Sequence, residues 1–245
     1  VPEETNRRLV DHTADFNLAY TEHARRNLLA EGLHPRRIIV TGSPMTEVLD
    51  ANQDAIEAST ALTDLGVEPG QYFLVSAHRE ENVDSPERLR SLLACLNAVA
   101  GDWELPVLVS THPRTRKRLE QVQDTPISEL VRFHEPFGFL DYNRLQMSAA
   151  CVLSDSGTIA EESTILGFPA VTLRSSIERP EALDTGAITM TDLDPAAVLR
   201  GIRFAEGRGA APERPADYQI TNTSARVVNF ILSTAFQHEF WSGLR

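Results

Sequence analysis

Strand-like and helix-like segments alternate along most of this chain, and that alternation constrains its fold more than any other feature. From residue 72 onward, short apolar runs rich in β-branched and aromatic residues are separated by amphipathic segments of helical length. The predicted strands are 72–76, 107–110, 131–134, 151–153, 170–173 and a segment near Ile188, and the predicted helices are 86–99, 115–123, 140–148, 159–166 and 195–205. Such alternation is typical of a parallel sheet with helices on both faces. The sequence therefore predicts an α/β fold.

Two shorter regions flank this series. Residues 1–45 show a helix, strand, helix, strand rhythm and are interpreted as the end of an incomplete first domain. Residues 46–217 form the predicted second domain, which begins with a helix over 46–62 and ends in a Gly/Pro/Arg-rich link, and 218–245 form a terminal helix. Because the chain begins at Val1 without methionine, we expect a fragment of a larger protein.

Composition excludes some classes of function. The formal net charge of −12 disfavours nucleic acid as a partner, because duplex binding needs concentrated Lys and Arg. The two cysteines, Cys95 and Cys151, lie in apolar stretches, which predicts buried thiols in a reducing compartment. Their spacing is not that of metal ligands. No apolar run is long enough to cross a bilayer and no secretion signal is present, so we expect no membrane partner and a cytoplasmic location.

Polar residues follow five consecutive predicted strands. Ligands of open parallel sheets bind outside the carboxyl ends of the strands. The segments at these ends are 78–81, 111–114, 135–136, 154–158 and 174–179. This recurrence predicts a ligand site along one edge of the sheet.

Residues 154–163, SDSGTIAEES, are the most informative of these segments. A buried strand that ends in small residues and opens a helix directs unpaired N–H groups and the positive end of the helix dipole at one spot, which favours an anion. Glu161 and Glu162 lie one turn further in, within reach of sugar hydroxyls. The segment is interpreted as a nucleotide-phosphate site around Ser156. The alternative is an ordinary strand-to-helix turn capped by Ser156.

Two histidines follow predicted strands. His78, beside Arg79, can donate a proton or a hydrogen bond to a leaving oxygen near neutral pH. The alternative is a histidine that only hydrogen-bonds a loop carbonyl. Ser156 lies two or three strands away from it. His112 and Arg114 either line the same cleft or belong to a solvated basic helix face.

Arg179 lies in a charged triplet just before a proline, in the loop after a buried strand. A rigid loop suits an arginine that holds a diphosphate or an acidic residue, and the alternative is a surface salt bridge.

Five motifs taken together resemble the non-hydrolysing UDP-N-acetylglucosamine 2-epimerase family. They occur in family order across nearly the whole chain: PEExNR at 2–7, TGSP at 41–44, SAHREEN at 76–82, SDSGTIAEES at 154–163 and ERPEA at 178–182. The resemblance implies a GT-B-like α/β fold, with two Rossmann-like domains facing across a cleft. The first of these domains would be incomplete here, and the terminal helix would pack back toward it.

The resemblance also implies roles for single residues. Those matching UDP-binding positions are Ser156, Gly157, Thr158, Glu162, Arg179 and, near the uracil, Tyr142, and those matching catalytic positions are Glu3 and His78. Independently of the resemblance, Arg79, His112 and Arg114 are candidate cleft residues because they follow predicted strands. The chain resembles one branch of this family at Thr158, at Ala160 and over residues 110–118 and 136–147. Enzymes of that branch form UDP-N-acetyl-L-fucosamine from its 2,6-dideoxy-talose epimer. The sequence-based hypothesis favours that branch over the parent activity.

The implied reaction is elimination and re-addition of UDP, without metal or other cofactor, in an enzyme expected to be a homodimer. Two alternatives share the nucleotide site: a GT-B glycosyltransferase and a non-catalytic UDP-sugar-binding domain.

Overall fold

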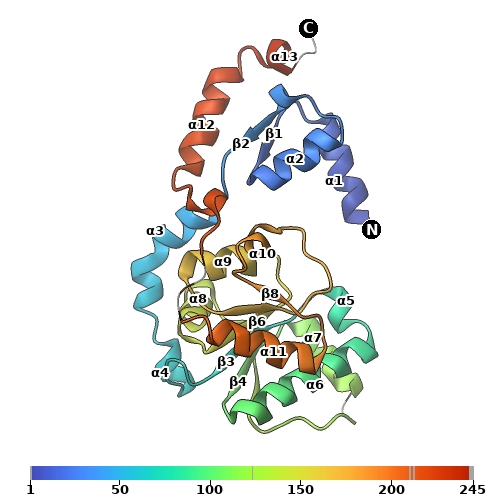
Figure 1. Cartoon of the computed structure of the whole chain (residues 1–245), viewed down its shortest axis with the longest axis vertical. Coiled ribbons are helices and arrows are strands. Elements are labelled where there is room, and N and C mark those ends of the chain that lie inside the picture. The colour runs from blue at the N-terminus through green and yellow to red at the C-terminus, as the bar shows by residue number, and fades with distance from the viewer. Residues whose placement is uncertain (1, 123, 210, 212, 243–245) are drawn as a thin grey trace. The chain divides into compact units, whose positions relative to one another are not determined.

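The computed structural model describes residues 2–122, 124–209, 211 and 213–242. The chain divides into two compact units, which are described separately (Figure 1). Unit 1 comprises residues 1–51 and 215–245, and unit 2 comprises residues 52–214. These limits differ by a few residues from those suggested by the sequence, 45 and 217.

Unit 2 contains a six-stranded parallel sheet, so the predicted α/β fold is confirmed. Its strands are β3 (Phe73–Ser76), β4 (Val107–Ser110), β5 (Val131–His134), β6 (Cys151–Ser154), β7 (Ala170–Thr172) and β8 (Thr189–Met190). Its helices are α4 (Ala61–Leu65), α5 (Glu80–Val83), α6 (Pro86–Trp103), α7 (Pro113–Leu119), η2 (Glu120–Val122), α8 (Phe139–Ser148), α9 (Ile159–Leu166), α10 (Glu181–Asp184) and α11 (Pro195–Glu206). The short helices α5 and α10 were not predicted, because four residues are too few to show helical periodicity.

The strand order is β5-β4-β3-β6-β7-β8. The chain therefore moves outward from β3 in one direction and, after β5, returns to the middle and continues in the other direction from β6. The point between β3 and β6 is where the order reverses, and in sheets of this kind ligands bind outside the carboxyl ends of the strands at such a point.

The sheet of unit 2 is buried on both faces. Successive strand residues point to opposite sides, so Phe73 and Val75 belong to one apolar cluster and Leu74 to the other. The first cluster is closed by α6 and α11, which lie against each other on one face, and the second by α8 and α9 (Figure 1). Gly201 allows the close approach of α11, since a Cβ atom there would lie 3.0 Å from Thr191 Cγ2. This packing holds the strand ends in fixed positions.

Unit 1 is a smaller α/β arrangement with two parallel strands. Its elements are α1 (Pro2–Thr13), β1 (Asn17–Ala19), α2 (Glu22–Ala30), η1 (Pro35–Arg37), β2 (Ile38–Val40), the first half of α3 (Met45–Glu57), η3 (Ala216–Gln219), α12 (Thr223–Thr234) and α13 (His238–Ser242). Thr46 Oγ1 donates to the Tyr218 carbonyl oxygen at 2.9 Å. Gly42 has φ +87°, and a Cβ atom there would lie 2.6 Å from Ile220 Cγ2. The C-terminal stretch of unit 1 therefore packs tightly on the turn after β2.

Two predicted helices are interrupted. The helix expected over 46–62 ends at Glu57, and the chain becomes helical again in α4. Between the two helices, Ser59 Oγ accepts the N–H of Ala61 at 3.2 Å, and the cap residue of α4, Thr60, makes no capping hydrogen bond with its side chain. The terminal helix is divided into α12 and α13. The hydroxyls of Ser233 and Thr234 both donate to carbonyls one turn back at 2.7 Å, which competes with regular helix continuation.

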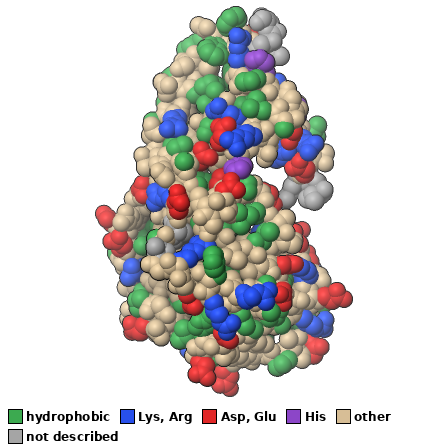
Figure 2. All heavy atoms as spheres, viewed as in Figure 1, with side chains coloured by type: hydrophobic (Ala, Val, Ile, Leu, Met, Phe, Trp, Pro, Cys, Tyr) green, Lys and Arg blue, Asp and Glu red, His purple; other side chains and the backbone are tan. Residues whose placement is uncertain are grey.

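The surface is mixed in charge. On the face shown in Figure 2, acidic and basic side chains are interspersed. Both cysteines are buried free thiols, as predicted, and burial raises the pKa of Cys95 to about 12. Within the described ranges no helix is both long and apolar enough to cross a membrane.

Candidate functional site

The loops after β3 and β6 lie side by side at the point where the strand order reverses. Ser76 and Ser154 are paired residues at the ends of these two strands. The residues that follow them, His78 on one loop and Ser156 on the other, are therefore neighbours at one edge of the sheet. The expectation that two or three strands separate them holds along the chain but is wrong in space, because the fourth strand of unit 2 pairs with the first.

Asp155 connects these two loops. Its carboxylate is fully buried and accepts the backbone N–H of His78 at 3.1 Å and that of Arg79 at 3.0 Å. The side-chain amide of Asn82 also donates to it at 3.0 Å. His78 Nδ1 lies 3.6 Å from Asp155 Oδ1, too far for a hydrogen bond but close enough for electrostatic attraction to a protonated ring. A buried carboxylate thus holds the backbone that carries His78.

The sequence analysis gave Asp155 no role. The available signal was an acidic residue directly after a buried strand, where a charge needs several donors to be retained. Which donors those are depends on the pairing of β3 with β6, which no local pattern shows.

Ser156 shapes the turn that precedes α9. Its N–H donates to Ser154 Oγ at 3.0 Å, and its own Oγ accepts the Thr158 N–H at 3.3 Å and lies 2.9 Å from Thr158 Oγ1. The cap residue of α9 is Thr158, whose side chain makes no capping hydrogen bond, whereas Ser156 closes the turn just before it through its Oγ. A Cβ atom at Gly157 would meet no atom within 4 Å, so the turn borders open space.

Arg179 lies against the first turn of α9, where it pairs with Glu161. Glu161 is only 2% exposed, so its carboxylate faces the interior. The expectation that Glu161 reaches sugar hydroxyls is therefore wrong, because its position on α9 directs it toward Arg179. Glu162, one position on, is half-buried and accepts the Gln146 side-chain amide at 2.7 Å.

A second arginine, Arg174, lies in the predicted segment 174–179, but no individual role was predicted for it. The Arg174 side chain is 2% exposed, and its two terminal nitrogens each lie 2.5 Å from an oxygen of Glu178. The hydrogen bonds from Arg174 lower the pKa of Glu178. Glu178 Oε1 also lies 3.8 Å from Arg79 Nη2. The loop after β7, which carries Arg179, is thereby tied to the loop after β3.

Tyr142, on α8, also faces this edge of the sheet. Burial raises the pKa of its hydroxyl, and the Glu162 carboxylate acts in the same direction. Ser76 and Gln146 are its hydrogen-bond partners. The structure thus brings Tyr142, Ser156, Glu162, Arg179 and His78 to one region of unit 2.

His112 and Arg114 are accounted for by local structure. His112 caps α7, since its Nδ1 accepts the Arg114 N–H at 3.2 Å. The Arg114 side chain is exposed and donates to Glu80 at 2.6 Å and to Asp84 at 3.2 Å. Of the two possibilities left open by the sequence, the structure supports a capped and solvated helix start for this pair.

Glu3 belongs to α1 in unit 1, and its side chain lies outside the part of the chain that is described. Its catalytic role remains a prediction.

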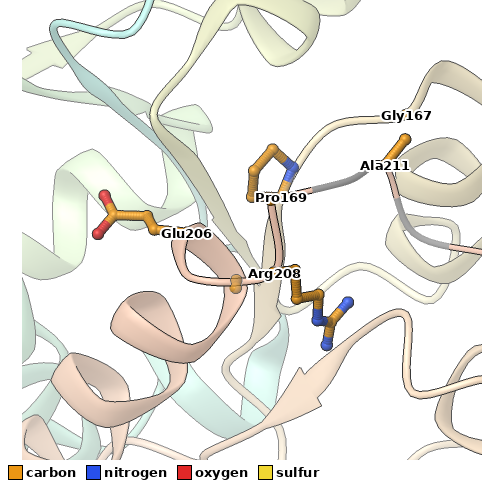
Figure 3. A pocket seen from close by; sticks show the side chains of 7 residues that line it. Gly167, Pro169, Glu206, Arg208 and Ala211 are labelled. Atoms are coloured by element: carbon orange, nitrogen blue, oxygen red, sulfur yellow. The ribbon is translucent and has the colours of Figure 1, made fainter.

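A cavity of about 300 Å³ lies elsewhere in unit 2 (Figure 3). It is lined by Gly167, Pro169, Ala205, Glu206, Arg208, Gly209 and Ala211, a set that contains no predicted site residue. Glu206 and Arg208 point away from each other, the first toward Trp103 Nε1 at 3.3 Å and the second toward the Ala187 carbonyl oxygen at 2.8 Å. Among the described residues, no group of three His, Cys, Asp or Glu could hold a metal ion.

Comparisons with known proteins agree with this arrangement. A family model described as UDP-N-acetylglucosamine 2-epimerase matches residues 1–232. The UDP-N-acetylglucosamine 2-epimerase of Methanocaldococcus jannaschii is 35% identical over 193 residues, which are 76% of this chain and 53% of that protein. That of Methanococcus maripaludis is 32% identical over 81% of this chain and 56% of its own length.

Two solved structures are also similar. The UDP-N-acetylglucosamine 2-epimerase of Rickettsia bellii superposes with a TM-score of 0.83 at 37% identity, covering 98% of this chain and 65% of that one. The Methanocaldococcus jannaschii enzyme in complex with UDP-GlcNAc and UDP gives a TM-score of 0.86 at 29% identity, covering 95% and 65%. The chain spans about half the length of the curated relatives it matches.

Proposed function

Because this chain belongs to the UDP-N-acetylglucosamine 2-epimerase family, we propose that it forms part of an isomerase that inverts C2 of UDP-N-acetylglucosamine. The observation that carries the proposal is the meeting of His78, Ser156 and Arg179 at the point where the strand order reverses. Parallel sheets of this order bind nucleotides there. The similarity to an enzyme whose structure holds UDP-GlcNAc and UDP supports the same ligand class.

The turn at 156–158 and the N-terminus of α9 would bind the diphosphate. The helix dipole favours negative charge at this place, and the open space beside Gly157 leaves room for it. Arg179 adds a guanidinium at the first turn of α9. Glu162 would accept the ribose hydroxyls, and Tyr142 would lie near the uracil.

The proposed reaction eliminates UDP and adds it back. A base removes the C2 proton, the C1–O bond to UDP breaks, and a C1–C2 double bond forms; protonation of C2 on the other face and attack of the UDP oxygen on C1 complete the inversion. Negative charge grows on the departing diphosphate, so groups that bind it more strongly in the transition state lower the barrier. His78 would hand a proton to the leaving oxygen, and Glu3 would be among the carboxylates that move the C2 proton.

We propose UDP-N-acetylglucosamine, the substrate of the parent activity, as the first candidate, ahead of the substrate of the fucosamine branch. The sequence favoured that branch through Thr158, Ala160 and the segments 110–118 and 136–147, whereas the relatives compared above carry the parent name. The 2,6-dideoxy-talose epimer therefore stands as the second candidate substrate.

The test is solvent exchange at C2. The full-length protein is incubated with UDP-N-acetylglucosamine or with the dideoxy-talose epimer in D2O, and deuterium at C2 is followed by NMR. We expect exchange and epimerisation with a higher kcat/KM for UDP-N-acetylglucosamine. A higher kcat/KM for the dideoxy-talose epimer would assign the protein to the fucosamine-forming branch instead. Binding of UDP without deuterium exchange at C2 would indicate a non-catalytic UDP-sugar-binding domain. Transfer of the sugar to an added acceptor would indicate a glycosyltransferase.

We further propose a homodimeric, cytoplasmic enzyme. Light scattering of the full-length protein after size exclusion would test the dimer, and fractionation of the source cells would test the location.

A further inference from the structure

A line of hydrogen-bonded side chains runs from the loop that carries His78 to the end of β8. Asn82 Nδ2 donates to Asp155 Oδ2 at 3.0 Å. Arg88 donates to Asn82 Oδ1 from Nη2 at 2.7 Å and from Nε at 3.2 Å. The same guanidinium pairs with Asp192 at 2.6 Å. Asn82 thus lies between an anion and a cation.

Its two neighbours fix the orientation of the Asn82 amide. A guanidinium only donates hydrogen bonds, whereas an ionised carboxylate only accepts them. The amide satisfies both only with its oxygen toward Arg88 and its nitrogen toward Asp155. Asn82 and Asp155 are both 0% exposed, so water cannot replace a lost partner in the flipped orientation. The amide is therefore held in one rotamer.

Asp155 needs that donor. Among the described residues, its hydrogen bonds come from the backbone N–H groups of His78 and Arg79 and from the Asn82 side-chain amide. The His78 side chain itself is 49% exposed. Because about half of the side-chain surface faces solvent, the position of the ring depends on the backbone that Asp155 holds.

We propose that Asn82 is a positioning residue, which holds the Asp155 carboxylate beneath the backbone of His78 and Arg79 and is itself held by Arg88. The consequence for catalysis rests on the proposed function, since it assumes that His78 acts on the departing UDP. The positioning of the loop does not depend on that assumption.

The first test measures the loop directly. Asn82→Asp keeps the size of the side chain but places a second carboxylate against Asp155. Arg88→Met removes the support behind Asn82 and leaves Asn82 in place. The matched control is Arg90→Met on the same helix, since within the described part of the chain Arg90 forms an ion pair only with the exposed Asp124, at 3.5 Å. Amide hydrogen exchange of the segment 77–82 is followed by mass spectrometry in the full-length protein.

We expect exchange in 77–82 to be faster by about fivefold or more in both test variants, the factor that follows from loss of one hydrogen bond to a buried charge, and unchanged in Arg90→Met. Equal exchange in Arg88→Met and Arg90→Met would overturn the proposal. If Asn82→Asp does not fold, Arg88→Met alone decides the outcome in this way.

The second test uses kinetics with UDP-N-acetylglucosamine. A misplaced His78 affects mainly the transition state, so we expect kcat to fall by roughly tenfold or more while KM changes by less than about threefold. Arg88→Lys, which keeps the positive charge, should recover part of the kcat lost in Arg88→Met. A rise in KM with unchanged kcat would contradict positioning of His78. If the wild-type enzyme epimerises no UDP-sugar, the proposed function fails, and the exchange experiment still decides on the positioning.

Discussion

The Arg179 guanidinium contacts the buried Glu161 carboxylate at the first turn of α9. An arginine predicted to bind the diphosphate therefore also neutralises an acidic residue of the helix at which the diphosphate would bind. Loss of Arg179 should have two separable effects, one on stability and one on affinity.

Arg179→Gln should lower the free energy of unfolding by about 1–3 kcal/mol, because it leaves a buried carboxylate without its charged partner. It should also weaken UDP binding by roughly tenfold. The double variant Arg179→Gln/Glu161→Gln should regain stability but not affinity. Denaturant unfolding and calorimetric UDP titration measure the two effects. Recovery of both in the double variant would show that Arg179 has only a structural role.

Ser156→Asp tests the diphosphate site. Aspartate retains an oxygen that can accept the Thr158 N–H, as Ser156 Oγ does at 3.3 Å, so the turn should persist while a negative charge is added. We expect UDP binding to weaken by at least ~1 kcal/mol. Ser156→Asn adds a side chain of the same size without charge and should cost less. Unchanged UDP affinity in Ser156→Asp by calorimetry would place the diphosphate elsewhere.

His78→Ala in the full-length enzyme should reduce turnover by roughly 10²-fold, the usual contribution of a positioned acid–base group. Because the contact of Asp155 is with the His78 backbone, the fold should be preserved. Steady-state kinetics, with thermal unfolding as a check on the fold, make the test. A variant with near-normal turnover would reduce His78 to a loop residue.

His112 should behave as a helix cap. His112→Ala is expected to destabilise the protein by about 1 kcal/mol, the usual effect of losing a cap, whereas His112→Asp should not, because aspartate caps well. UDP affinity should be equal in both variants. If both lose UDP affinity alike while stability is unchanged, His112 lines the nucleotide site after all.

The Arg174–Glu178 pair predicts a pH dependence. Hydrogen bonds from Arg174 lower the pKa of Glu178 below its ordinary value of 4.5 in the folded state. A depressed carboxyl pKa stabilises the fold above the unfolded-state value, and this contribution is lost as the pH falls through the folded-state value. The Tm advantage of the wild type over Glu178→Gln should therefore be largest near neutral pH and shrink below about pH 4.5. Glu68→Gln, at an exposed glutamate, is the control; an advantage that does not change with pH would refute the argument.

The positions of helices and strands could be predicted from the sequence better than the pairing of the strands in space. The strand predicted at 107–110 and the helix predicted at 159–166 coincide with β4 and α9, because apolar runs and a glycine after Leu166 mark their limits locally. The pairing of β3 with β6 is not local. It joins the His78 N–H to Asp155 across 77 residues, and no periodicity encodes such a contact.

In the candidate site, too, local patterns could be predicted and contacts between distant residues could not. Ser156 and Arg179 were predicted as contacts from their place after strands. Asp155 and Arg174 lie in the same predicted segments, but their supporting roles were not predicted, because those roles depend on burial. A buried ionised side chain is retained only with partners, and the partners come from other loops. Charged residues that directly follow a buried strand should be considered as supports of a site as well as contacts to a ligand.

Unit 1 consists of two stretches of chain, with the whole of unit 2 between them. During translation, all of unit 2 has been synthesised before Pro215 is added, so it can fold while unit 1 waits for its second stretch. At ribosomal rates of about 5–20 residues per second, the delay is on the order of seconds. In that interval Thr46 and Gly42 lack the contacts that Tyr218 and Ile220 later provide. The first stretch of unit 1 therefore leaves the ribosome well before the residues on which it packs.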